Sequence, residues 1–88
     1  MEEDEQFPDF MTQDEAEELN TKIKRSLSDV FTNTYVKKEY KVNSQYGWHV
    51  FGMCNSGLEF KKITKLIKFA EDEKIEFMIF NGNLVKFI

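Results

Sequence analysis

The sequence predicts a small α+β domain in which two N-terminal helices pack on an antiparallel β-sheet. Three observations support this fold class. A capping signal at Thr12 precedes apolar residues spaced three and four apart, which is typical of a helix. The apolar segment 48–53 is typical of a buried strand, and Asn81-Gly82 between two apolar segments favours a closing hairpin. At 88 residues the chain forms one domain at most.

Charge is divided unevenly along the chain. Residues 1–19 contain nine acidic side chains and no basic one, whereas residues 20–88 contain twelve Lys or Arg and seven Asp or Glu. We therefore divide the chain into an acidic flexible tail, residues 1–11, and a folded domain, residues 12–88. The tail either keeps the protein dispersed in water or folds back and screens the basic body.

The first expected helix begins at a capping box, in which Thr12 and Glu15 satisfy each other's backbone N–H groups. Its apolar stripe comprises Ala16, Leu19, Ile23 and Leu27. A second helix is expected from Asp29, a favourable N-cap residue, to Tyr40. Val36 and Tyr40 would face the core from that helix.

The middle of the chain is expected to supply two strands. The first is segment 48–53, which is followed by the turn residues Asn55-Ser56-Gly57. The second is segment 58–63, followed by irregular or helical residues to Glu73. A helix over the same stretch is the alternative, because one helical face would collect Phe60, Ile63, Ile67 and Ala70.

The last two strands, 75–80 and 84–88, flank the Asn81-Gly82 turn, where a type I′ hairpin needs positive φ at both positions. Side chains on strand 75–80 are apolar on both faces. One face carries Ile75, Phe77 and Ile79, and the other carries Met78 and Phe80. A strand of this composition is expected in the interior of a sheet, covered on both sides.

Several short motifs occur in a fixed order along the chain. They are Gln13-Asp14, Tyr35–Tyr40, Trp48-His49, residues 55–57, and the pair Lys74 and Gly82. In sequence and spacing they resemble the small (eight-kilodalton) dynein light chain family. Its second helix ends in Tyr-Ile-Lys-Lys-Glu-Phe, and Trp-His and Asn-Phe-Gly follow at the same distances. The chain departs from the family by about nine extra residues between Gly57 and Lys74.

The resemblance implies a homodimer in which a middle strand, near Leu58–Ile63 here, crosses to pair with the partner's sheet. It also implies that an extended segment of a client protein, such as a dynein intermediate chain, adds beside this strand. Each dimer would hold two client segments and gain affinity from bivalency. The implied partner-binding residues are Asn55, Gly57, Leu58, Glu59, Phe60, Lys61 and Lys62, with Asp29 at the start of the second helix.

The dimer interface implied by the resemblance contains Trp48, His49 and Ile63. Desolvation of His49 there would disfavour its protonated form, so acid would favour the monomer. The alternative is a hydrogen-bonded structural His. A catalytic His49 is not expected, because the sequence offers no nucleophile or acid partner nearby.

A complete helix over residues 60–72 would favour a different function. A helix followed by a β-hairpin is the order found in winged-helix nucleic-acid-binding proteins. Phosphates would then be neutralised by Lys61, Lys62, Lys65 and Lys68. Because this segment contains no Arg, Asn or Gln to read base edges, such binding would be salt-sensitive and without sequence preference.

Neither an enzyme nor a cofactor is expected. The run of carboxylates at residues 71–73 is at a loop, which gives no sheltered pocket for acid–base chemistry. One Cys and one His make neither an internal disulfide nor a plausible metal site, so Cys54 is expected to be a small buried residue. We find no signal peptide or membrane span in the sequence. A cytoplasmic location is expected, and the resemblance adds association with the cytoskeleton.

Overall fold

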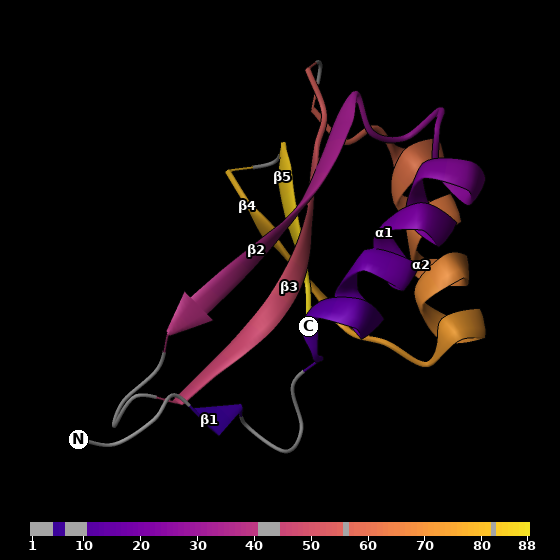
Figure 1. The fold of residues 1–88 in the computed structure, drawn as a ribbon. Helices are drawn as coiled ribbons and strands as arrows, with labels where there is room; N and C mark the ends of the chain where they lie inside the picture. The colour runs from indigo at the N-terminus through magenta and orange to yellow at the C-terminus, as the bar shows by residue number, and fades with distance from the viewer. Residues whose placement is uncertain (1–4, 7–10, 41–44, 56, 82) are drawn as a thin grey trace.

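The computed structural model describes residues 5–6, 11–40, 45–55, 57–81 and 83–88. Within them, the helices lie together on one side of a twisted sheet (Figure 1). The elements in chain order are β1 (Glu5–Gln6), α1 (Gln13–Ser26), β2 (Asn33–Tyr40), β3 (Gln45–Met53), α2 (Phe60–Glu73), β4 (Phe77–Phe80) and β5 (Leu84–Phe87). The α+β class is confirmed. The prediction that both helices are N-terminal is wrong, because β2 and β3 lie between them.

Four strands form an antiparallel sheet in the order β2, β3, β5, β4. Consequently β3 and β4 run parallel with β5 between them, and β3, α2 and β4 make a split β-α-β unit. The short β1 pairs parallel with Gln45 and Tyr46 of β3. Because Tyr46 also pairs with Tyr40 of β2, β1 lies on the other edge of β3, the edge that β5 uses further along.

Part of the predicted acidic tail belongs to this sheet. Glu5–Gln6 are the two residues of β1, and Met11 forms an antiparallel bridge with Trp48, whose N–H donates to the Met11 carbonyl at 3.2 Å. The remaining tail residues, 1–4 and 7–10, lie outside the described part of the chain. Thus the boundary between tail and domain is bridged by backbone pairing.

The first helix and its capping box are confirmed. In α1 the Glu15 N–H donates to Thr12 Oγ1 at 3.2 Å, and the Thr12 N–H donates to Glu15 Oε1 at 2.9 Å. The predicted apolar stripe is buried: Ala16, Leu19, Ile23 and Leu27. Local signal and packing therefore agree over this element.

The predicted second helix over 29–40 is wrong, since residues 33–40 form strand β2. Alternation with period two explains the difference. Val36 packs against the core, whereas Tyr35 stacks on Phe51 on the other face of the sheet, with ring centroids 5.3 Å apart. The β-branched and aromatic residues of this segment prefer such a surface to a helix.

The predicted strand over 58–63 is also wrong, and the helical alternative is confirmed: α2 begins at Phe60 and runs to Glu73. Its buried residues are Leu66, Phe69 and Ala70. A spacing of three and four over fourteen residues fits a helix, whereas a strand would have ended after the first few of them.

Phe87 lies at the centre of the core and is fully buried. Its ring contacts those of Phe31, Phe69 and Phe77, with centroid distances of 5.9, 6.4 and 6.3 Å. These partners come from the loop before β2, from α2 and from β4. A single side chain of the last strand thereby joins both layers of the fold.

The closing hairpin is confirmed, with β4 and β5 paired from Phe77–Phe87 to Phe80–Leu84. Asn81 has the positive φ, 54°, that the turn prediction requires, and Gly82 lies outside the described residues. The prediction that the strand before this turn is interior is wrong. Among the described strands, β4 pairs with β5 alone and is an edge of the sheet.

Candidate functional site

The two edges of the four-stranded sheet differ in character. Along β2 the side chains include Lys37, Lys38 and Glu39, the kind of charged residues that prevent an edge strand from pairing with another chain. β4 reads Phe-Met-Ile-Phe and has no charge, no proline and no bulge. Only the β4 edge lacks these protective features.

Apolar side chains of β4 are exposed on both faces of the sheet. Met78 lies opposite Lys86 on the face away from the helices, and this residue is 48% exposed. Ile79 lies opposite buried Val85 on the helix side and is 43% exposed. Phe80, on the same face as Met78, is 36% exposed. An exposed edge strand that is apolar and uncharged is a surface on which another strand can pair.

The main chain of β4 also has groups that point outward. The Ile88 N–H donates to the Glu76 carbonyl at 2.9 Å, which makes Glu76 and Ile88 a hydrogen-bonded pair of the ladder. Because such pairs alternate along antiparallel strands, Phe77 and Ile79 direct their N–H and C=O groups away from β5. These groups are positioned to pair with a further strand.

A groove of about 520 Å³ runs between α2 and β4. Its walls are mostly apolar, with three charged residues among them. The lining consists of Ile67, Ala70, Glu71, Lys74, Ile75, Glu76, Phe77, Met78 and Ile88. Ile67 is 44% exposed on the α2 side. An edge strand beside a helix groove can accept main-chain pairing and side chains together.

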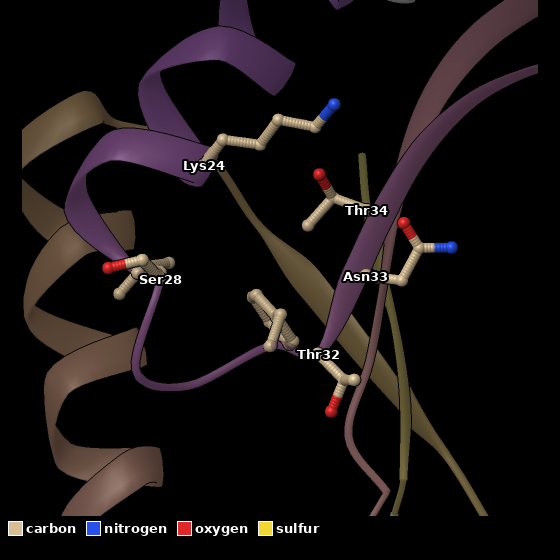
Figure 2. A pocket seen from close by; sticks show the side chains of 7 residues that line it. Lys24, Ser28, Thr32, Asn33 and Thr34 are labelled. Atoms are coloured by element: carbon tan, nitrogen blue, oxygen red, sulfur yellow. The ribbon is translucent and has the colours of Figure 1, made fainter.

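A second, smaller hollow of about 240 Å³ lies where the end of α1 faces the start of β2. Figure 2 shows Lys24, Ser28, Thr32, Asn33 and Thr34 around it, and Leu27 and Phe31 complete its lining. The last carbonyls of α1 give this end of the helix a partial negative charge, which Lys24 offsets. The polar ends of Ser28, Thr32 and Asn33 point away from one another and do not converge on one position (Figure 2). We therefore take the β4 groove as the candidate site.

The partner-binding residues expected from the sequence do not form a strand edge. Asn55 and Gly57 lie in the loop after β3, Glu59 is the N-cap of α2, and Phe60 is 83% exposed at its first position. Half-buried Leu58 packs against the core. Exposed Lys61 and half-buried Lys62 belong to the first turn of α2.

Asp29, expected at the client site, pairs instead with α2. Both of its carboxylate oxygens accept hydrogen bonds from Lys65 Nζ at 2.8 Å. These bonds are the main cause that lowers the pKa of Asp29 below its ordinary value. They also neutralise one lysine of the basic α2 face, so the nucleic-acid alternative loses part of the charge on which it depends.

The residues expected at a dimer interface make contacts inside the chain. His49 is 1% exposed, and its Nδ1 lies 3.2 Å from the Phe87 carbonyl, so Nδ1 must carry the proton that it donates. Its Nε2 lies 3.7 Å from Glu39 Oε1, and Glu39 is also paired with Lys86. Trp48 packs against the core, and Ile63 is half-buried on α2. The interface role of these three residues stays a prediction.

In the described part of the chain, no group of three or more His, Cys, Asp or Glu side chains could hold a metal ion. None of the described helices is both long and apolar enough to cross a membrane.

Comparison of the chain with protein-family models, with curated proteins and with solved structures gives no match. The resemblance to the dynein light chain family therefore stays a prediction from the residues. Two elements that the resemblance implied differ in the structure. Tyr35–Tyr40 belongs to a strand and not to the end of a helix, and residues 60–73 form a helix where a crossing strand was expected.

Proposed function

We propose that this protein is a non-enzymatic binding module that takes an extended segment of another polypeptide as an additional strand beside β4. One observation carries the proposal: β4 has the composition of an interior strand but the position of an edge strand. A further strand beside it would cover the apolar side chains on both faces and pair the outward main-chain groups.

Each part of the site would have a defined role. The outward N–H and C=O groups of Phe77 and Ile79 would form the ladder with the incoming strand. Alternate side chains of that strand would enter the groove beside Ile67 or lie over Met78, because successive residues point to opposite faces. The segment that fits is therefore apolar at successive positions and free of proline.

This proposal keeps the strand capture expected from the sequence and moves it from residues 55–62 to β4. The earlier location depended on a strand at 58–63, which is α2 in the structure. Membership of a dynein complex, implied by the resemblance, is a prediction that strand capture at β4 does not require.

The test is a titration of the ¹⁵N-labelled protein with a short peptide of alternating Val and Phe residues flanked by lysines. We expect amide shifts over residues 76–81 and over the groove residues of α2, with little change in β2. A peptide of the same sequence with alternate amides N-methylated is the control, because it keeps the side chains but cannot donate the ladder hydrogen bonds.

Substitution at the edge should remove the binding. Ile79→Lys is expected to weaken it about tenfold or more, about 1.4 kcal/mol, whereas Met53→Lys, at an exposed apolar position on β3, should not. Shifts concentrated on residues 55–62 or on β2 would overturn the assignment to β4, as would equal binding of the N-methylated peptide.

A further inference from the structure

We infer that the strand which completes β4 is β4 of a second copy of this chain, paired antiparallel across a two-fold axis at Ile79. The inference rests on the proposed function and names the partner for the same site. The segment that the site selects is apolar at each successive position and lacks charge and proline, and β4 itself, Phe77–Phe80, is such a segment.

In a symmetric dimer, the two faces of the sheet limit the registers in which β4 can pair with its copy. Residues directly opposite each other in an antiparallel pair point to the same face, so a residue on the helix side must meet another on the helix side. Ile79 and Met78 point to opposite faces. The axis must therefore pass through one residue and its own copy, and the two central residues of β4, Met78 and Ile79, pair the most of the strand with its copy.

The Ile79 register agrees better with the side chains. It places Ile79 opposite the partner's Ile79 on the helix side and Met78 opposite the partner's Phe80 on the other face. The outward N–H and C=O groups of Ile79 would exchange both hydrogen bonds with the partner's Ile79. The Met78 register would instead place the carboxylate of Glu76 opposite the aromatic ring of the partner's Phe80.

No like charges meet in this arrangement. Along the chain, the charged residues nearest to β4 are Lys74 and Glu76, before its first residue, and the residues after it are Asn81 and Asn83. Lys86 lies opposite Met78 on β5, one strand further from the β4 edge. Antiparallel pairing brings the start of one β4 beside the turn of the other, so the charges of one copy face neutral amides. The β2 edge, with Lys37 and Lys38, would bring like charges together in a similar pairing.

The exposed area along β4 is small for a dimer interface. Met78, Ile79, Phe80 and the neighbouring Ile67 are each between 36% and 48% exposed. With one strand edge they supply on the order of a few hundred Å² for each copy, less than the ~800 Å² of a typical stable interface. We therefore expect a reversible dimer whose population rises with protein concentration.

The experiment is sedimentation equilibrium over a range of protein concentration, with charge substitutions at Ile79. Because the axis passes through this residue, Ile79→Lys places two ammonium groups opposite each other, and Ile79→Glu places two carboxylates opposite each other. Each variant alone should be monomeric, and an equal mixture of the two should form a heterodimer. Met53→Lys should dimerise like the unmodified chain, and circular dichroism checks that every variant is folded.

Oxidative crosslinking then tests the register. Ile79→Cys should crosslink to its own copy, and Met78→Cys should crosslink much more slowly. The unmodified chain is the control for Cys54, which is 1% exposed. Efficient crosslinking through Met78→Cys alone would overturn the Ile79 axis.

The possible failures can be told apart. A monomer at all concentrations that still binds the apolar peptide at β4 overturns the self-pairing and leaves the proposed function standing. A dimer that survives Ile79→Lys overturns the self-pairing as well, and the peptide titration then decides the proposed function independently. Loss of both the dimer and the peptide signal in the unmodified chain would overturn both.

Discussion

Gly52 of β3 lies directly against the ring of Phe31. A Cβ atom added at Gly52 would lie 2.7 Å from Phe31 Cδ1 and Cε1, closer than carbon atoms approach in folded proteins. Phe31 is itself held edge-on against Phe87, with an interplanar angle of 84°. The absence of a side chain at residue 52 is therefore a packing requirement of the helix side of the sheet.

Gly52→Ala is accordingly expected to lower the free energy of unfolding by about 1–3 kcal/mol, because the Phe31 ring must shift within a packed core. Urea denaturation followed by circular dichroism measures the change. Phe31→Leu in the Gly52→Ala background should recover part of the loss, since the smaller side chain vacates the overlapping space. Strictly additive effects of the two substitutions would contradict the contact.

Truncation of Phe87 should have a larger effect. Phe87→Ala removes a fully buried ring that contacts three other aromatic rings and is expected to cost about 3–5 kcal/mol. Phe80→Ala on the same hairpin is the matched control, because that ring is 36% exposed and should cost within about 1 kcal/mol. Equal losses from the two variants would show that the hairpin does not lie in the orientation described.

Cys54 should react slowly with thiol reagents while the protein is folded. Burial raises the pKa of its thiol above the ordinary value of 9.0, and Sγ donates to the Val30 carbonyl at 2.9 Å. We expect the rate of alkylation by iodoacetamide to rise with a midpoint above pH 9.0 in the native protein and to be much faster in urea. A native midpoint below that pH would contradict the buried position.

The same shift predicts how stability changes with pH. Because the raised pKa of Cys54 favours the neutral thiol in the folded state, its contribution is present below about pH 9 and is lost as the pH rises further. Cys54→Ala should remove that alkaline loss.

The contribution of Asp29 to stability depends on pH in the opposite direction. The hydrogen bonds from Lys65 lower its pKa below 3.8, so the stabilisation by the pair is present above that pH and is lost as the pH falls. In a carboxyl titration by NMR, Lys65→Met should raise the pKa of Asp29 toward its ordinary value. Both side chains are exposed, so the unfolding free energy should change little at neutral pH. An unchanged titration in Lys65→Met would contradict the pair.

Short sequence motifs predicted the start of the first helix and the closing turn, because interactions between nearby residues determine both. The capping box at Thr12 and the turn at Asn81 are recognisable because their partners lie within four residues along the chain. The segment predicted as a helix from Asp29 to Tyr40 forms a strand over 33–40, because its β-branched and aromatic residues prefer a pleated surface although Asp29 is a favourable helix N-cap. The periodicity of such a short segment does not distinguish a helix from a strand.

The candidate site was predicted only in part. Apolar residues on both faces of 75–80 were visible in the sequence and led to an interior strand, whereas the structure places that strand at the edge. Strand order depends on pairing between residues far apart in the chain, which composition does not encode. The disagreement between composition and position is nevertheless the observation on which the proposed binding function rests.

The bridge between Met11 and Trp48 has a consequence for the connectivity of the fold. Phe87 pairs with Val50, so a strand continued two residues beyond Phe87 would reach Trp48, the position that Met11 occupies. β5 and Met11 are thus two pieces of one interrupted strand, and the last strand lies close to the start of α1 (Figure 1). A circular permutant that joins residue 88 to residue 11, with its new ends between β2 and β3, would keep the pairings among β2, β3, β4 and β5. The order of elements in such a chain would be β-α-β-β-α-β, with the same sheet and the same helices on one face.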